Sequence, residues 1–186
     1  LVEASKGLAG KIQARAVNVA VEAEVEAFVR FAHEAMGGLN GLVNNAGILR
    51  DGLLVKKDRQ TGAVVKLSAA QWQAVIDVNL TGATLMVREV VAKMIEAEQK
   101  GVIVNISSIA RHGNRGQSSY TAAKSALAAN TKTWALEFAP FGIRVCALSP
   151  VAGETPMLKT FMGEDTPEMR ARFLATIPIG RFSTPE

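Results

Sequence analysis

Three short apolar runs recur along the 186 residues of this chain, at 39–44, 101–106 and 143–149. Their sequences, LNGLVN, GVIVNI and IRVCALS, are apolar almost throughout and do not alternate cleanly with polar residues. Segments of ten or more residues with helical spacing lie between them. Strands of this kind are typical of a parallel sheet that helices cover on both faces. The sequence therefore predicts an open α/β fold, made of a single domain over residues 1–186.

The first third of the chain adds a strand, a helix and an insert. Residues 12–19 (IQARAVNV) alternate well enough to predict a further strand. Residues 22–36 carry apolar side chains at helical spacing, and the glycine pair at 37–38 ends that helix. Residues 50–67 are polar and charged, which predicts a hairpin or a flexible insert with a turn at 61–62.

The next elements begin with a capping box. Ser68 and the glutamine three residues later open a helical stretch that runs to about residue 99, and Gly82 interrupts this stretch without ending it. A further helix is predicted over 118–138. A last short helix begins at Thr166, with proline in its first position.

Both ends of the sequence resemble interrupted helices. Residues 1–7 are typical of the last turns of a helix that a glycine stops, and residues 184–186 resemble the start of another helix. We therefore expect the sequence to be an internal portion of a longer protein.

Composition narrows the class of protein. The net charge is +4, and the basic residues are spread along the chain, which argues against a nucleic-acid-binding protein. No apolar run reaches the roughly 18 residues of a membrane span, so no membrane association is expected. The single cysteine, Cys146, is expected to be a small buried side chain. One cysteine forms neither an internal disulfide nor a cysteine-cluster metal site, which favours the reducing cytoplasm and predicts no metal.

Distinctive segments follow each of the three apolar runs. Asn45-Ala46-Gly47 comes after the first, Ser108 after the second and residues 150–155 after the third. In open α/β folds, ligands bind at the C-terminal ends of the strands. We therefore expect these three segments to line one edge of the sheet.

A Tyr-x-x-x-Lys pair lies at the start of the predicted 118–138 helix. Tyr120 and Lys124 are one turn apart on one face of that helix. A nearby ammonium stabilises the phenolate, so Lys124 is expected to lower the pKa of Tyr120 from about 10 and let it exchange a proton with a substrate oxygen. The Ser108 hydroxyl could bond the same oxygen. Taken alone, the pair also fits a half-buried aromatic residue beside a solvated lysine.

Further motifs come in a fixed order along the chain. They are Asn44-Asn45-Ala46-Gly47, Asn79 in VNLTG, Ser108, Tyr120 with Lys124, and Pro150 with Thr155. This ordered set resembles the short-chain dehydrogenase/reductase family. The segments NNAGILRDGLL and GNRGQSSYTAAKSAL are similar to those of its 3-oxoacyl-[acyl-carrier-protein] reductase-like members. The resemblance implies a Rossmann-like doubly wound parallel sheet that binds NADP or NAD.

The resemblance also implies a role for each catalytic candidate. Tyr120 would be the general acid for carbonyl reduction or the base for alcohol oxidation, and Ser108 would position the carbonyl oxygen. Lys124 would hold the nicotinamide ribose and lower the tyrosine pKa, so that Tyr120 and Lys124 also contact the cofactor. Asn79 would support a water that links Lys124 to solvent.

Three further segments would bind the dinucleotide. Asn18 and Val19 would approach the adenine, although Asn18 stands where the family usually has aspartate. Asn45, Ala46 and Gly47 would pass under the cofactor ribose. The residues along the nicotinamide carboxamide and phosphates would be Pro150, Val151, Gly153 and Thr155, with valine at 151 where glycine is frequent.

The most specific activity that the resemblance implies is 3-oxoacyl thioester reduction in fatty acid biosynthesis, on a substrate linked to acyl-carrier-protein or CoA. The enzyme would be a homotetramer or homodimer. Two alternatives stay open: a dehydrogenase for another small alcohol such as a sugar or steroid, and a non-catalytic dinucleotide-binding scaffold. The family's glycine-rich turn, its first two strands and its last strand have no counterpart in the sequence, which fits the interrupted ends.

Overall fold

A parallel three-stranded sheet organises this computed structural model, which describes residues 7, 10–155, 158 and 166–184. The strands are β1 (Gly41–Asn44), β4 (Gly101–Ile106) and β5 (Ile143–Leu148), in the order β1-β4-β5. Asn44 pairs with Asn105, which pairs with Ala147, so the three C-terminal ends meet at one edge. The three predicted strands and the α/β class are therefore confirmed.

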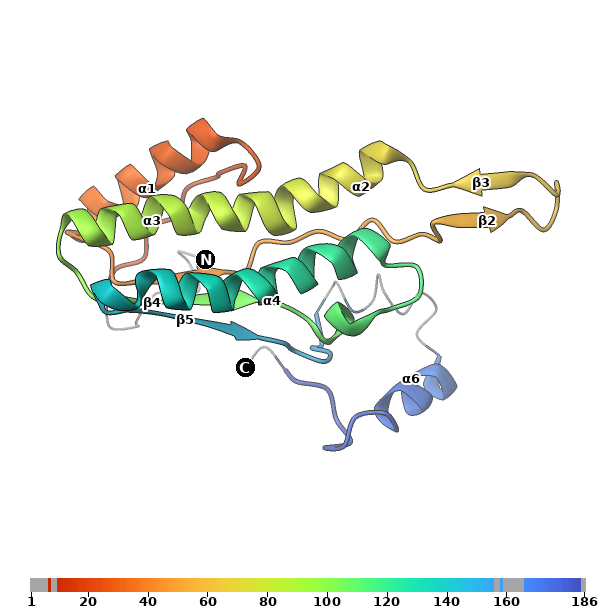
Figure 1. The fold of residues 1–186 in the computed structure, drawn as a ribbon. Helices are drawn as coiled ribbons and strands as arrows, with labels where there is room; N and C mark the ends of the chain where they lie inside the picture. The colour runs from red at the N-terminus through yellow and green to blue at the C-terminus, as the bar shows by residue number, and fades with distance from the viewer. Residues whose placement is uncertain (1–6, 8–9, 156–157, 159–165, 185–186) are drawn as a thin grey trace.

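The long helices α1 (Glu22–Met36), α3 (Ala83–Glu96) and α4 (Ser118–Phe138) lie on one side of the sheet (Figure 1). The main apolar core fills the space between them and the strands. Its largest fully buried side chains include Val25, Met94, Ile103, Leu127 and Ile143. The core thus holds α3 and α4 at fixed positions above the strand ends.

Local signals set the bounds of α1 as predicted. Glu22 and Glu24 lie in its first turn, where acidic groups favour the positive end of the helix dipole. Val25 and Val29 face the core. The helix ends at Gly37, whose φ of 68° lies in the left-handed region that glycine adopts without strain.

The predicted capping box begins α2 (Ala69–Ile76). The Gln71 N–H donates to Ser68 Oγ at 3.1 Å, and the Ser68 N–H donates to Gln71 Oε1 at 3.2 Å. The helix continues through a π-helical turn, η2 (Asp77–Gly82), into α3. At Gly82 a Cβ would lie 2.8 Å from Val19 Cγ2, so this glycine lets the chain before α1 approach the helix closely.

The insert is a hairpin that extends beyond the body of the protein (Figure 1). Its strands are β2 (Val55–Lys57) and β3 (Val64–Lys66), which pair antiparallel. The Asp58 carboxylate orders the turn by accepting bonds from Gln60 N and Thr61 N, at 3.0 and 2.8 Å. Of the two alternatives left open for this segment, the hairpin is confirmed.

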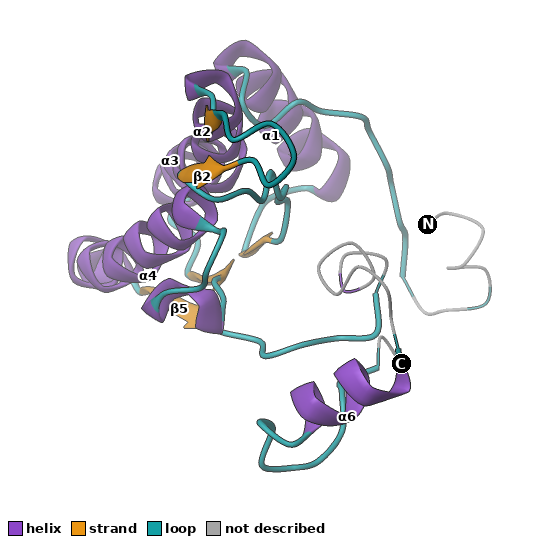
Figure 2. Cartoon of the chain, turned by 90° about the vertical axis from the view of Figure 1, so that its right-hand side faces the viewer, coloured by secondary structure: helices purple, strands orange, loops and turns teal. Residues whose placement is uncertain are grey.

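The C-terminal segment carries α6 (Pro167–Leu174), which begins where it was predicted, with Met169 N donating to Thr166 Oγ1 at 3.2 Å. It lies apart from α3 and α4 (Figure 2). Phe173 packs near a small buried cluster of Ile177 and Phe182. The predictions for residues 1–7 and 184–186 fall mostly outside the described residues.

Two expectations from the sequence are wrong, the strand over residues 12–19 and the burial of Cys146. The strand predicted over residues 12–19 is absent: residues 11–18 have no regular secondary structure, and a turn follows at 19–20. Within the described residues no strand pairs with this segment, and a strand without a partner has no ladder of hydrogen bonds. Cys146 is exposed, because it lies on the sheet face opposite the three long helices. That face also exposes 61% of Val43 and 55% of Leu148, so the described helices cover one face of the sheet and not both.

Among the described residues, no helix combines the length and the apolar character needed to cross a membrane. The same part of the chain contains no group of histidine, cysteine or acidic side chains that could hold a metal ion.

Candidate active site

The predicted segments after the three strands lie at one edge of the sheet. Asn45 and Ala46 follow β1 and are exposed, and Gly47 is half-buried. Ser107 N donates to Leu148 O at 2.7 Å, and Ile109 N lies 3.4 Å from Pro150 O, so the segments after β4 and β5 run side by side. The strand topology therefore produces the shared edge that the sequence predicted.

Asn79 reaches this edge from the π-helical turn. Its side chain is 1% exposed and bonds both backbone groups of Ile48: Ile48 N donates to Oδ1 at 2.8 Å, and Nδ2 donates to Ile48 O at 2.9 Å. A Cβ at Gly47 would lie 3.4 Å from Asn79 Oδ1 and 3.8 Å from Lys124 Nζ. Asn79, Gly47 and Lys124 are therefore immediate neighbours. Turns of π type are often found at functional sites, because the widened turn displaces side chains from regular α-helical positions.

Lys124 is a buried lysine, and the whole residue is 4% exposed. Its Nζ donates to the carbonyl of Ile106, the last residue of β4, at 2.6 Å. Burial disfavours the ammonium and lowers the pKa of Lys124 from 10.5 to about 8. Near neutral pH this amine therefore exchanges protons far more readily than an ordinary lysine.

Tyr120 lies one turn before Lys124, whose Nζ is 5.6 Å from the centre of the phenol ring. Burial raises the pKa of Tyr120 above 10.0, a hydrogen bond from Ser108 opposes this, and the Asp51 carboxylate raises the pKa further. The expectation that Lys124 makes this phenol acidic is therefore wrong for the chain alone. The physical reason is that removal from water raises the pKa of the phenol more than the Ser108 bond lowers it, and that the Lys124 amine is directed toward the Ile106 carbonyl.

Two adjacent serines follow β4 and have different partners. Ser107 is 2% exposed, and its Oγ donates to the backbone carbonyl of Lys124 at 2.9 Å. Ser108 is half-buried and interacts with the Tyr120 hydroxyl, while its Oγ accepts from Ala110 N at 3.1 Å. Ser108, the serine that the sequence predicts for the site, is therefore the one that faces Tyr120.

A short helical turn, η3 (Ile109–His112), leads from Ser108 toward α4. Two α4 hydroxyls hold it in place: Thr121 Oγ1 donates to Ala110 O at 3.0 Å, and Ser125 Oγ donates to Arg111 O at 2.6 Å. The helix that carries Tyr120 and Lys124 is therefore also tied to the loop that carries Ser108.

A row of buried polar side chains beneath the site was missed in the sequence. Asn44 Nδ2 donates to Asn105 Oδ1 at 2.9 Å, and Asn105 Nδ2 donates to Thr131 Oγ1 at 2.9 Å. Thr131 Oγ1 in turn donates to Leu127 O at 2.8 Å. This row ties β1 and β4 to α4. The available signal was a lone asparagine, Asn105, within an otherwise apolar strand.

The outer cofactor candidates lie on either side of the edge. Asn18 Oδ1 accepts from Ala20 N at 3.1 Å, and Val19 packs on Gly82 at the end of η2. The loop 150–155 is tied to Ser183, which accepts from Glu154 N and donates from its own N to Ala152 O. Contacts within the chain thus hold both segments in place. None of these contacts by itself indicates that either segment binds a ligand.

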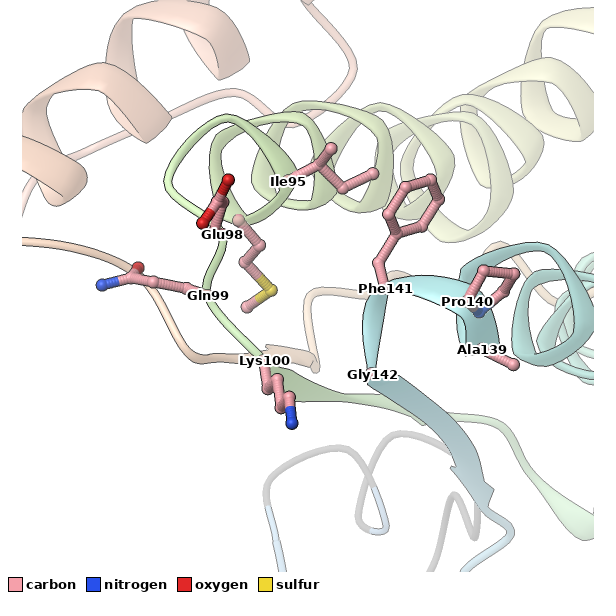
Figure 3. Close-up of a pocket in the computed structure, with 9 residues that line it drawn as sticks. Ile95, Glu98, Gln99, Lys100, Ala139, Pro140, Phe141 and Gly142 are labelled. Atoms are coloured by element: carbon pink, nitrogen blue, oxygen red, sulfur yellow. The ribbon is translucent and has the colours of Figure 1, made fainter.

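A separate pocket of about 380 Å³ lies at the opposite edge of the sheet, where β4 and β5 begin. Figure 3 shows the ring of Phe141 beside Ile95, with Lys100 at the lower end of the pocket. Because it is at the N-terminal ends of the strands, this pocket is distinct from the site around Tyr120.

Comparison with known proteins identifies the family. The profile of the family described as short chain dehydrogenase matches residues 1–165. The chain belongs to the short-chain dehydrogenase family. The predicted resemblance and the Rossmann-like α/β fold are therefore confirmed, and the matched range includes Asn79, Ser108, Tyr120 and Lys124.

Individual relatives of this short-chain dehydrogenase differ in their substrates. A 3-oxoacyl-[acyl-carrier-protein] reductase FabG of Thermotoga maritima is 40% identical over 188 residues, which cover all of this chain and 70% of the relative. A 2-(S)-hydroxypropyl-CoM dehydrogenase 3 of Xanthobacter autotrophicus is 38% identical, over 91% of this chain and 63% of the relative. Among solved structures, gox2181 matches with a TM-score of 0.76 and 31% identity, over 91% of this chain and 62% of that one. The chain therefore spans less than two thirds of the last two proteins.

Proposed function

We propose that this short-chain dehydrogenase reduces the ketone of a 3-oxoacyl thioester, with NADP or NAD as hydride carrier and Tyr120 as general acid. The observation that carries the proposal is the convergence of three side chains at the strand ends: Ser108 interacts with the Tyr120 hydroxyl, and Lys124 Nζ lies 5.6 Å from the centre of the Tyr120 ring. Two hydroxyls this close to one another can both bond a carbonyl oxygen placed between them. The similarity to acyl-carrier-protein reductases supports the thioester as substrate.

The surface around Gly47 fits the ribose of a dinucleotide. Glycine at 47 leaves open the space beside Asn79 Oδ1 and Lys124 Nζ that a Cβ would occupy. Lys124 uses one donor on Ile106 O, and an ammonium has three, so donors remain for ribose hydroxyls. The full proposed set for the cofactor is Asn18, Val19, Asn45, Ala46, Gly47, Tyr120, Lys124, Pro150, Val151, Gly153 and Thr155. When bound, the nicotinamide supplies or accepts the hydride.

The chain's own residues then bind, orient and protonate. Because its pKa is raised, Tyr120 holds its proton at neutral pH, as a general acid for carbonyl reduction must. Ser108 donates to the same carbonyl oxygen and fixes its direction. Lys124 holds the ribose, and its lowered pKa suits it to return a proton to the phenolate. Asn79 fixes the Ile48 backbone beside Gly47 and is proposed to support the water that connects Lys124 to solvent.

Turnover of a short 3-oxoacyl thioester tests the proposal. The full-length protein should oxidise NADPH or NADH with acetoacetyl-CoA, and Tyr120→Phe should abolish turnover while the circular dichroism spectrum stays that of the wild type. Retained turnover in Tyr120→Phe would refute the role of Tyr120.

The second candidate function is a dehydrogenase of another small alcohol, and the similarity to a hydroxypropyl-CoM dehydrogenase favours it. Turnover of a panel of sugar and steroid ketones would distinguish it from the first candidate. Cofactor binding without turnover of any carbonyl would instead support the scaffold alternative. Assembly as a homotetramer or homodimer, a cytoplasmic location and a part in fatty acid biosynthesis remain predictions.

A further inference from the structure

A second connection ties the chain after β1 to the start of α4. Gly52 N donates to Gly116 O at 2.8 Å, and Gly52 and Gln117 form an isolated parallel bridge. The side chains reinforce this contact: Gln117 Nε2 donates to Asp51 Oδ2 at 2.8 Å, and Asn114 Nδ2 donates to Gln117 Oε1 at 2.9 Å. The proposed catalytic roles use none of these groups.

Gln117 is 5% exposed and stands immediately before the first residue of α4. Its backbone carbonyl accepts from Thr121 N at 2.7 Å, so the same residue anchors the first turn of the helix. A buried amide without partners is costly, and here Asp51 satisfies the donor end. The position of the first turn of α4, which contains Tyr120, therefore depends on Asp51.

We propose that Asp51 and Gln117 are positioning residues, whose hydrogen bond fixes the first turn of α4 and so holds Tyr120 in place beside Ser108. The proposal rests on the proposed function, in which Tyr120 is the acid. It assigns a reason for the charge at 51: an aspartate both accepts from Gln117 and opposes ionisation of the phenol, whereas a neutral acceptor would do only the first.

Within the described part of the chain, further charged groups lie on the segments that flank Tyr120. On α4 itself Lys124 is directed toward Ile106 O. Arg111 and His112 on η3 bond one another at 3.1 Å, and Asp77 on η2 accepts from Gln73 at 2.7 Å. Helix α2 carries no charged residue, Arg50 donates to Leu49 O, and Arg115 lies in the loop before α4. Asp51 is the carboxylate that raises the pKa of Tyr120.

Two substitutions separate the hydrogen bond from the charge. Asp51→Asn keeps an oxygen that accepts from Gln117 and removes the charge. Gln117→Met keeps the size of the side chain and removes the bond. Matched controls are Gln73→Met, which breaks an exposed Gln–Asp bond on α2, and Glu137→Gln, which removes an exposed charge near the far end of α4.

The primary measurement is a spectrophotometric titration of the phenol in the full-length protein, with Tyr120→Phe as the blank. Asp51→Asn should shift the Tyr120 titration to lower pH. High salt should shift it in the same direction in the wild type, because Asp51 is exposed and its field is screened. Neither control should move it. A Tyr120 titration unchanged in Asp51→Asn would overturn the electrostatic part of the proposal.

Steady-state kinetics test the positioning part. Gln117→Met should lower kcat by about 10- to 100-fold with little change in the KM for the cofactor, because a small displacement of a reacting group is enough for such a loss. The two controls should retain wild-type kcat. A kcat for Gln117→Met equal to that of Gln73→Met would overturn this part. If the wild type turns over no carbonyl, the proposed function fails, and the phenol titration still tests the inference by itself.

Discussion

The amide of Asn79 pairs with the backbone of Ile48 at both of its ends, with distances of 2.8 and 2.9 Å. It connects the π-helical turn to the chain after β1, across 31 residues of sequence. Gly47 precedes Ile48 and lies next to Lys124. The pairing of Asn79 with Ile48 therefore fixes the backbone that lines the proposed cofactor site.

Asn79→Leu should therefore lower both stability and activity. It leaves the N–H and C=O of Ile48 without these partners, at a cost of about 1–3 kcal/mol for each buried group that water does not reach. Asn79→Asp keeps the acceptor for Ile48 N, but it places a buried carboxylate oxygen against Ile48 O and should also lower stability. Urea denaturation gives the free energies of unfolding. Equal stability for Asn79→Leu and the wild type would show that water replaces the amide easily.

Lys124 predicts a pH dependence of stability. In the folded chain its pKa is about 8, against 10.5 for the free side chain, so burial of the ammonium opposes folding below pH 8. Between pH 8 and 10.5 the unfolded chain binds more protons than the folded one, and stability therefore rises with pH. The whole rise corresponds to roughly 3 kcal/mol.

The difference between the wild type and Lys124→Met isolates this contribution, since other groups titrate alike in both. In urea denaturation at a series of pH values, the wild type should gain stability relative to the variant from about pH 8 upward. Parallel curves for the two proteins would mean that the lysine keeps an ordinary pKa in the folded chain.

Ser107 and Ser108 should respond differently to the same change. Ser108→Ala removes the hydrogen bond that lowers the Tyr120 pKa, so the phenol should titrate at higher pH and kcat should fall by about 10²–10³-fold, as for other donors to a reacting oxygen. Ser107→Ala removes a bond to the Lys124 carbonyl and should cost about 1 kcal/mol of stability without moving the Tyr120 titration. A larger shift of the phenol in Ser107→Ala would reverse the assignment.

Local patterns predicted the helices and strands that carry the site. The helices at 22–36 and 118–138 agree with the structure to the residue, because the signals that define a helix lie within the segment itself. The run at 101–106 agrees as well, because an apolar segment of this kind suits a central strand and β1 and β5 are present to pair with it. Residues 12–19 did not form the predicted strand, because a strand depends on a partner that may lie anywhere in sequence.

The sequence predicted which residues form the site, but it did not predict their burial or the shifts in their pKa values. The i,i+4 spacing of Tyr120 and Lys124 placed both side chains on one face. The spacing did not show how deeply the two side chains are buried. It also did not show that the Ile106 carbonyl accepts a hydrogen bond from the Lys124 amine. Asp51 is also far from Tyr120 in sequence, and its effect on the phenol follows from tertiary contacts alone.

The row Asn44–Asn105–Thr131 yields a final prediction, because its three buried side chains satisfy one another by hydrogen bonds. Thr131→Val keeps the shape of the side chain and leaves Asn105 Nδ2 unpaired, at a cost of about 1–3 kcal/mol. Asn105→Leu removes the donor and should cost more, since Asn44 Nδ2 then also loses its 2.9 Å bond and keeps only the longer one to Ala83 O, at 3.3 Å. In the double variant the Thr131→Val change should cost much less than it does alone, because no unpaired amide remains at position 105. Strict additivity of the two free-energy changes, measured by urea denaturation, would mean that Asn105 and Thr131 do not depend on one another and that α4 is held over β4 by apolar packing alone.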